Sequence, residues 1–284
     1  MSGMCGAPRT AIRFFVVDAF TCQSYRGNPA AVVLLDGDFP ADRWLQSIAA
    51  EFRHSETAFI RPRGPNAWDV RWFTPTVEID LCGHATLATA HVLGGRNVFH
   101  ARGGEMVGWT PGPGWVELQL PADPPVPVEL PAEVPAALGN VPVVGAGRGR
   151  YDLLVQVACA ADVRGLRPDV EALGRLPFRG VIVTAPDDDG PGVVSRCFYP
   201  AVGVPEDSAS GSAHSTIGGW WFDRLGVDRL PARQLSTRGG AVQVIRRGGH
   251  VVLQGQAVTV MCGELLPPAP PGRWRPNGGN AEPI

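Results

Sequence analysis

The chain has 284 residues, a formal charge of −2 and 18% charged residues, so its charge gives no indication of a nucleic acid or membrane-surface partner. No stretch approaches the roughly 20 apolar residues that a membrane-spanning helix needs. The 36 glycines and 28 prolines favour many short strands and turns over a helical bundle, and the length suits two domains.

The first part of the chain predicts several strands and two helices. Residues 1–10 lack the pattern of a signal peptide and are expected to form a loose leader. Apolar runs bounded by turn residues predict strands at 12–19, 30–35, 57–60, 70–73 and within 104–120. Residues 40–51 place apolar side chains on one helical face. A second helix is expected from Gly83 to Leu93, because Gly94 is a typical C-terminal cap.

The second part repeats this mixture after a proline-rich segment at 121–142, which we interpret as a crossover between two lobes. Strands are predicted at 151–158, at 181–185 and within 241–261. We expect a first lobe over residues 12–125 and a second lobe over 126–256. The proline-rich residues 267–284 are expected to be a disordered tail.

One supersecondary unit occurs twice, which is the main evidence for two similar lobes. An Arg-x-Phe-x-Pro-x-Val strand end begins at Arg71 and again at Arg196. A glycine-containing helix start follows each copy, 12 residues on at Gly83 and 15 residues on at Gly211. A shared Arg-Gly-Gly turn then leads to a further strand in each copy. These features predict an α+β fold with two pseudo-symmetric lobes.

The stretch at residues 206–219 is the second of these helix starts, and the expected site is organised around it. Small residues let the backbone approach a ligand closely. The first amides of a helix have no partner within the helix, so together with the helix dipole they favour a bound anion. If the two lobes face each other, the helix starts at Gly83 and Gly211 meet across one cleft.

Glu56, His84 and Asp207 are the candidate acid–base residues. Glu56 stands between a helix and a strand among apolar neighbours, and burial would raise its pKa, as proton transfer requires. The alternative interpretation is a carboxylate that only binds backbone amides at a strand start. His84 and Asp207 belong to opposite helix starts, where they could instead serve as a cap and as a partner of the helix dipole.

Cys82 is open to two interpretations. A thiol at a helix N-terminus is expected to have a lowered pKa and could act as a base or nucleophile. A two-thiol racemase would need a second cysteine in the other repeat, which offers Asp207 and Ser208 instead. None of the six cysteines forms Cys-x-x-Cys, so we expect free thiols in a cytoplasmic protein and no metal site. The glycine-rich segments match neither a dinucleotide fingerprint nor a Walker loop, so no cofactor is expected.

With these residues in view, the chain resembles the PhzF family of phenazine-biosynthesis isomerases, within the diaminopimelate epimerase-like fold. The resemblance covers roughly residues 16–266 and rests on several motifs in the expected order. They are Asp18-Ala-Phe-Thr with Arg26-Gly-Asn-Pro, His54-Ser-Glu-Thr-Ala-Phe, Phe73-Thr-Pro, Gly83-His-Ala-Thr-Leu-Ala-Thr-Ala-His-Val-Leu and Gly203-Val-Pro-Glu-Asp-Ser-Ala-Ser-Gly-Ser-Ala.

The resemblance implies two lobes, each a curled, barrel-like mixed sheet around a central helix, with the site between them. It also implies that a last strand, at about residues 257–266, joins the first lobe. It implies a cofactor-free proton shift on a small cyclic, unsaturated amino acid, and commonly a homodimer. By resemblance, Glu56 moves the proton, while His84 and Asp207 bind and polarise the substrate. The residues that would hold the substrate are Asn28, Cys82, Gly83, Ser208, Gly211 and Ser212.

Two positions depart from the family pattern within the expected cleft. Asp207-Ser-Ala-Ser-Gly-Ser stands where Asp-Pro-Ala-Thr-Gly-Ser is usual, and Cys82 precedes the first glycine. Both concern the substrate rather than the isomerase class. Our hypothesis is an isomerase of secondary metabolism that uses Glu56 as its acid/base. The alternatives are an amino-acid racemase, epimerase or dehydratase that uses Cys82, and a non-catalytic metabolite-binding protein.

Overall fold

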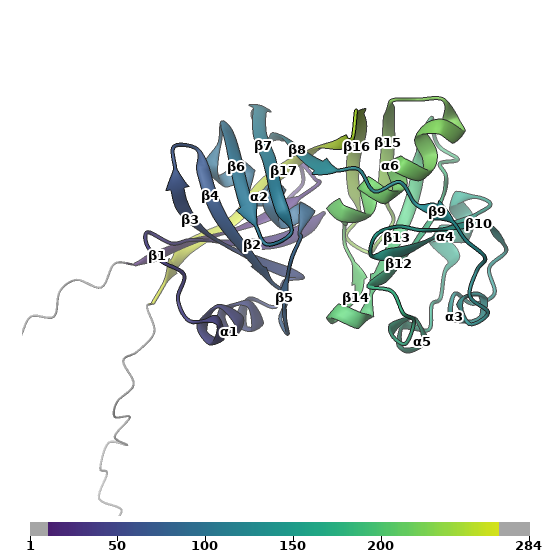
Figure 1. Ribbon diagram of the computed structural model, residues 1–284, viewed down its shortest axis with the longest axis horizontal. Coiled ribbons are helices and arrows are strands. Elements are labelled where there is room, and N and C mark those ends of the chain that lie inside the picture. Colours follow the sequence, from purple (N-terminus) through teal and green to yellow (C-terminus); the bar gives the residue numbers. More distant parts are fainter. Residues whose placement is uncertain (1–10, 267–284) are drawn as a thin grey trace, which may run out of the picture.

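The computed structural model describes residues 11–266, which form two lobes side by side (Figure 1). The expected leader and tail lie outside the described residues. The first lobe is a closed barrel of β1 (Ile12–Ala19), β2 (Asn28–Leu34), β3 (Glu56–Gly64), β4 (Ala67–Phe73), β6 (Arg96–Ala101), β7 (Gly104–Gly112), β8 (Trp115–Pro121) and β17 (His250–Leu265). Each strand pairs with the next in this order, and β17 pairs with β1 to close the ring.

The second lobe repeats the same succession of strands. They are β10 (Val143–Arg148), β11 (Asp152–Val157), β12 (Gly180–Pro186), β13 (Val193–Tyr199), β15 (Arg229–Gln234), β16 (Gly240–Arg247) and the first part of β17. In both lobes the second and third strands are parallel, the fourth and fifth are parallel, and the other neighbours are antiparallel. The predicted α+β fold with two pseudo-symmetric lobes is confirmed.

Short strands extend both halves at equivalent places. β5 (Glu78–Ile79) pairs with β4, and β14 (Val204–Asp207) pairs with β13. The segment interpreted from the sequence only as a crossover contains β9 (Val126–Pro127), which pairs with β10, and the short helix α3 (Val134–Ala137). No helix within residues 11–266 is long and apolar enough to cross a membrane.

One helix fills each lobe, and the other helices cover the outside. The central helices are α2 (Gly83–Leu93) and α6 (Gly211–Leu225). The outer helices are α1 (Asp42–Phe52) on the first lobe and α4 (Ala160–Gly165), α5 (Val170–Gly174) and a 3₁₀ turn (Pro200–Val202) on the second.

The composition of α2 explains why it can lie inside a barrel. Its first eight residues are all buried, and most are small. The buried hydroxyls of Thr86 and Thr89 donate to the carbonyls of Cys82 and Ala85, one turn earlier, so both hydroxyls are satisfied without water. A helix with no polar face is stable only when it is enclosed, and the barrel supplies that enclosure.

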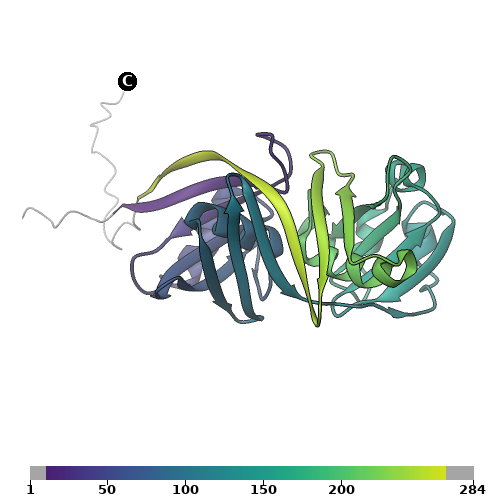
Figure 2. The same cartoon turned by 90° about the horizontal axis from the view of Figure 1, so that it is seen from above.

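Strand β17 belongs to both lobes. It pairs with β16 from His250 to Gln254 and then with β1 from Ala257 to Leu265. Figure 2 shows this yellow strand leaving the second lobe and crossing to lie beside the purple β1. One cluster of buried side chains also runs through both lobes, from Leu87 of α2 to Ile217 of α6. Shared backbone and shared core therefore fix the two central helices relative to each other.

Candidate active site

The two central helices begin at the same point, one from each lobe. α2 begins at Gly83 and α6 at Gly211, and a methyl group added to Gly83 would lie 2.8 Å from the Cα of Gly211. Glycine is needed at this contact because a side chain would force the helices apart. The free first-turn amides of both helices therefore face one region, and this arrangement favours a bound anion.

A cavity of about 360 Å³ lies at this junction. Both lobes contribute to its wall, and its size suits a small metabolite. The first lobe contributes Glu56, Glu78, Ile79, Asp80, Leu81, Cys82, Gly83, His84 and Arg102. The second lobe contributes Tyr151, Arg179, Tyr199, Val202, Val204, Asp207, Ser210, Gly211 and Ser212.

Glu56 is aimed at this cavity by the turn that precedes β3. Helix α1 ends at Phe52, and the left-handed backbone of its C-cap Arg53 (φ 56°) redirects the chain. Glu56 is the first residue of the strand that follows. Its Oε2 atom is buried, lies 3.3 Å from His84 Nε2 and makes no aligned hydrogen bond with any described residue. Burial, together with the charge of Asp207, raises the pKa of Glu56 to about 8. Glu56 can therefore offer a proton to a bound molecule near neutral pH.

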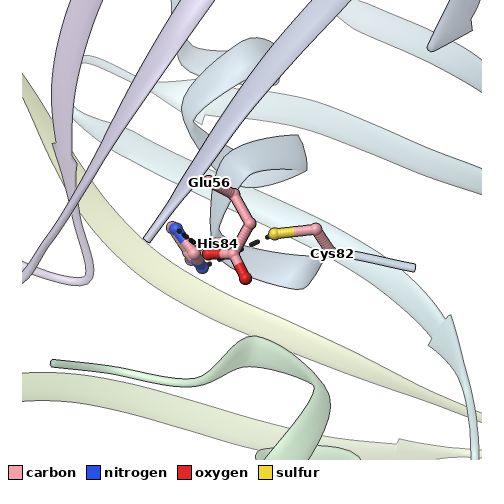
Figure 3. Close-up of side chains that lie close together, drawn as sticks. All are labelled: Glu56, Cys82 and His84. Carbon is pink, nitrogen blue, oxygen red and sulfur yellow. Dashed lines mark hydrogen bonds and ion pairs between the residues drawn. The ribbon is translucent and has the colours of Figure 1, made fainter. Parts of the chain in front are cut away.

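The imidazole of His84 contacts Glu56 through one nitrogen and Cys82 through the other (Figure 3). Burial lowers the pKa of His84 to about 3, so the ring is neutral and its contact with Glu56 is not an ion pair. Ser55 Oγ lies 3.2 Å from Nε2 and donates its own proton to Asn28. Nε2 must then carry the ring proton, which leaves Nδ1 as the acceptor for the Cys82 thiol at 3.6 Å.

This row of hydrogen bonds continues into the second lobe. Ser55 donates to Asn28 Oδ1 at 3.0 Å, and Asn28 Nδ2 donates to Asp207 Oδ1 at 2.7 Å and to the Ala209 carbonyl at 2.9 Å. Burial raises the pKa of Asp207 to about 6, although the hydrogen bond from Asn28 favours the ionised form. At neutral pH Asp207 is therefore mostly ionised and Glu56 mostly protonated, which separates the two carboxyls into different roles.

The expectation that the helix N-terminus lowers the pKa of Cys82 is wrong. Cys82 is the N-cap residue of α2, but its side chain is buried. Burial, with the nearby charges of Glu56 and Asp207, raises the pKa of the thiol well above its ordinary value. A neutral thiol that donates to His84 is a poor base and a poor nucleophile.

Glu56, Cys82 and His84 also form a cluster whose potential metal ligands lie within 4.8 Å of one another. The contacts do not fit a single ion, because Cys82 faces Nδ1 of the imidazole and Glu56 faces Nε2 on the other side of the ring. One ion can bind only one of these nitrogens. The cluster is better described as a hydrogen-bonded row than as a ligand set.

Arg179 and Tyr199 form the opposite wall, and the sequence analysis missed both. Arg179 donates from Nε and Nη2 to the carboxylate of Asp152, and from Nη2 to Ser212 Oγ at 3.0 Å. Its guanidinium carbon lies 5.1 Å from the centre of the Tyr199 ring, whose hydroxyl hydrogen-bonds Ser210 Oγ at 2.9 Å. The internal repeat could have identified Arg179, because this residue directly precedes β12, the strand of the second lobe that corresponds to β3.

Seven of the nine predicted site residues surround the cavity. They are Glu56, Cys82, Gly83, His84, Asp207, Gly211 and Ser212. Asn28 and Ser208 lie instead beside a separate hollow next to Asp207. Asn28 is buried and bonded at both ends of its amide, so it supports Asp207. The geometry does not support the expectation that these two side chains contact a substrate directly.

Known proteins of one family are similar to this chain along most of its length. The family model PhzC-PhzF, phenazine biosynthesis-like protein, matches residues 17–123 and 127–263. An uncharacterized isomerase of Pseudomonas aeruginosa is 44% identical over 261 residues, which cover 89% of this chain and 98% of the relative. An uncharacterized isomerase of Halalkalibacterium halodurans is 40% identical over 262 residues, which cover 89% and 97%. The crystal structure of a PhzF-family phenazine biosynthesis protein from Enterococcus faecalis is 36% identical, with 90% and 100% coverage and a TM-score of 0.83.

Proposed function

The chain belongs to the PhzC-PhzF family of phenazine biosynthesis-like proteins and is an isomerase, and we propose that it moves a proton within a small substrate with Glu56 as the acid/base. The substrate we propose is an unsaturated cyclic amino acid or a related carboxylate, in secondary metabolism and without a cofactor. The observation that carries this proposal is the buried Oε2 of Glu56, which has no hydrogen-bond partner among residues 11–266, beside two converging helix N-termini.

The proposed reaction needs only one residue to carry the proton. The neutral carboxyl of Glu56 gives its proton to one carbon of the substrate. The carboxylate that results takes a proton from another carbon, so the double bond moves and Glu56 returns to its starting state. His84 is neutral and Asp207 is ionised, and they would orient the polar groups of the substrate. The amides at Gly83 and Gly211 would hold its carboxylate.

A symmetric two-base racemase is less well supported. Such a mechanism needs a second base at the position equivalent to Cys82. The two N-caps show that this position is Ser210, and not Asp207 or Ser208 as the sequence suggested. Ser210 is occupied as a helix cap and by the hydroxyl of Tyr199, and the Cys82 thiol is neutral. These contacts favour proton transfer by a single carboxyl.

The test is a turnover screen with the full chain. The panel contains dihydro-hydroxyanthranilate, unsaturated proline-type acids, diaminopimelate and proline. We expect one compound to be isomerised, and we expect kcat to fall about 10²- to 10⁴-fold in Glu56→Gln, the contribution of a positioned acid/base. Glu105→Gln, at an exposed position of β7, is the matched control and should keep full activity. A folded Glu56→Gln variant with undiminished turnover would disprove the role of Glu56.

A further inference from the structure

The strand registers show which residues of the two lobes are equivalent. Thr57 of β3 pairs with Phe73 of β4, and Val181 of β12 pairs with Phe198 of β13. Phe73 and Phe198 are the corresponding phenylalanines of the Arg-x-Phe repeat. Thr57 and Val181 are therefore equivalent positions at the starts of equivalent strands.

The residues that precede these two positions belong to opposite walls of the cleft. Gly180 takes the place of Glu56, and Arg179 takes the place of Ser55. Both Glu56 and Arg179 line the same cavity. The pseudo-symmetric cleft thus presents a carboxyl from one lobe and a guanidinium from the other.

The Arg179 side chain is immobilised but keeps one free donor edge. Asp152, whose side chain is 2% exposed, binds it through Nε and Nη2, and Ser212 accepts a further hydrogen bond from Nη2. Its guanidinium carbon lies between 5.1 and 5.2 Å from the ring centres of Tyr199 and Tyr151. Among the described residues, Nη1 has no hydrogen-bond acceptor. A guanidinium fixed in this way has already lost its rotational freedom, so its remaining donors are preorganised for a ligand.

We propose that Arg179 determines substrate specificity, and that its Nη1 edge binds an anionic group of the substrate next to the start of α6. This inference rests on the proposed function, because it concerns the same cleft and names the property by which that cleft selects its substrate. Arg179 would distinguish a carboxylate from the corresponding uncharged amide, since the amide cannot form a charge-assisted hydrogen bond with the guanidinium.

The charges of the cavity show why such a cation is needed. Asp207 is mostly ionised at neutral pH and would repel an anionic substrate. The other arginine of the wall, Arg102, is paired with Glu78 and Asp80. The positive charge of Arg179 opposes the repulsion by Asp207 and reaches across the cavity, because it acts to lower the pKa of both Glu56 and Asp207 against the larger effect of burial. Asp152 balances the charge of Arg179 but leaves the Nη1 donors free for a second carboxylate.

The test compares the binding of 2-aminobenzoate and the neutral 2-aminobenzamide by isothermal titration calorimetry. We expect the wild-type chain to prefer the acid. Replacing Arg179 alone would leave Asp152 as a buried, unpaired charge, so Arg179→Met is combined with Asp152→Asn. In this double variant the Kd for the acid should rise about 10- to 100-fold, which is the loss of one hydrogen bond to a charged group, while the Kd for the amide stays the same.

Arg150→Met is the matched control, because Arg150 stacks on the same Tyr151 ring at 5.0 Å but does not line the cavity. It should keep the wild-type preference. The titrations are repeated with Glu56→Gln, so that a failure of Glu56 as the acid/base is distinguished from a failure of Arg179 as the anion-binding residue. Equal binding of both compounds by the wild type, binding of neither, or an unchanged preference in the double variant would overturn the inference.

Discussion

At Glu56 the removal of a charge from water matters more than any single neighbour. Burial is the largest cause of its raised pKa, and the charge of Asp207 adds to it. The same burial keeps His84 neutral and the Cys82 thiol protonated. Asp207 is the partial exception, because its hydrogen bond from Asn28 favours the ionised form. One enclosed space therefore contains a proton donor, a neutral imidazole and an anion.

The pKa values of Asp207 and Glu56 predict a bell-shaped pH dependence of kcat/KM. Activity should rise as Asp207 ionises, around its pKa of about 6, and fall as Glu56 loses its proton, around its pKa of about 8. The measurement is a pH–rate profile of the wild type beside Asp207→Asn, which should lose the acidic limb. A rate that continues to rise above pH 9 would show that Glu56 is not required in its protonated form.

Cysteine reactivity tests the assignment of Cys82. Cys22 and Cys262 are exposed and should be alkylated by iodoacetamide in the folded protein, whereas the buried, neutral Cys82 should react only after unfolding. Peptide mapping by mass spectrometry gives the order of reaction. Cys82→Ala should keep activity within about tenfold, because it removes a hydrogen bond of about 1 kcal/mol rather than a base. Preferential labelling of Cys82 would contradict this account.

Short sequence motifs predicted the acid–base residues of the site correctly but gave a wrong prediction for the pKa of Cys82. Glu56, His84 and Asp207 could be predicted because each is a polar residue within a short motif. The pKa of Cys82 could not, because a rule based on the helix terminus ignores burial by distant residues. The contact between Ser55 and Asn28 depends on the parallel pairing of β2 with β3, which no local pattern specifies.

At the scale of elements, two ion pairs explain the Arg-x-Phe repeat. Arg71 binds both carboxylate oxygens of Glu78, and Arg196 binds both carboxylate oxygens of Glu206. Each pair fastens a short strand, β5 or β14, to the strand that precedes it. These strands lead directly to the two helix starts. The sequence showed the repeated arginines but could not identify their partners.

The contact between Gly83 and Gly211 gives a prediction for the helix starts. Gly83→Ala would place a methyl group against the backbone of Gly211, so we expect a loss of about 1–3 kcal/mol in the free energy of unfolding and a strong loss of activity. Gly165→Ala is the matched control, since Gly165 ends a helix and a methyl group there would have no atom of the described residues within 4 Å. Urea denaturation of both variants measures the difference. Equal stability of the two variants would contradict the close approach of the helices.

At the scale of the molecule, the last strand makes the two lobes interdependent. The first barrel lacks a strand between β8 and β1 until β17 is in place. We therefore expect a fragment of residues 11–121 to show no cooperative thermal unfolding by circular dichroism. The same fragment linked to residues 250–266 should regain a cooperative transition. Cooperative unfolding of the shorter fragment would show that the barrel does not need β17.

The internal repeat predicted two lobes, because it is visible as self-similar sequence. The repeat alone did not show that one strand pairs with both lobes. The family resemblance implied that a last strand at about 257–266 joins the first lobe, and β17 does pair with β1 from Ala257 to Leu265. The opposition of Glu56 and Arg179 emerges only when the registers of both barrels are compared. The order of the elements along the chain and the meeting of the two helix starts could therefore be predicted, whereas the side-chain contacts across the cleft could not.

The measurement that tests the central claim most directly is proton NMR of the substrate in deuterated water. Wild type, Glu56→Gln and Cys82→Ala are compared under the same conditions. We expect deuterium to appear at a ring carbon with the wild type and with Cys82→Ala, and not with Glu56→Gln. Deuterium at an amino-acid α-carbon that persists in Glu56→Gln but disappears in Cys82→Ala would contradict the single-carboxyl mechanism and establish a thiol-dependent racemase.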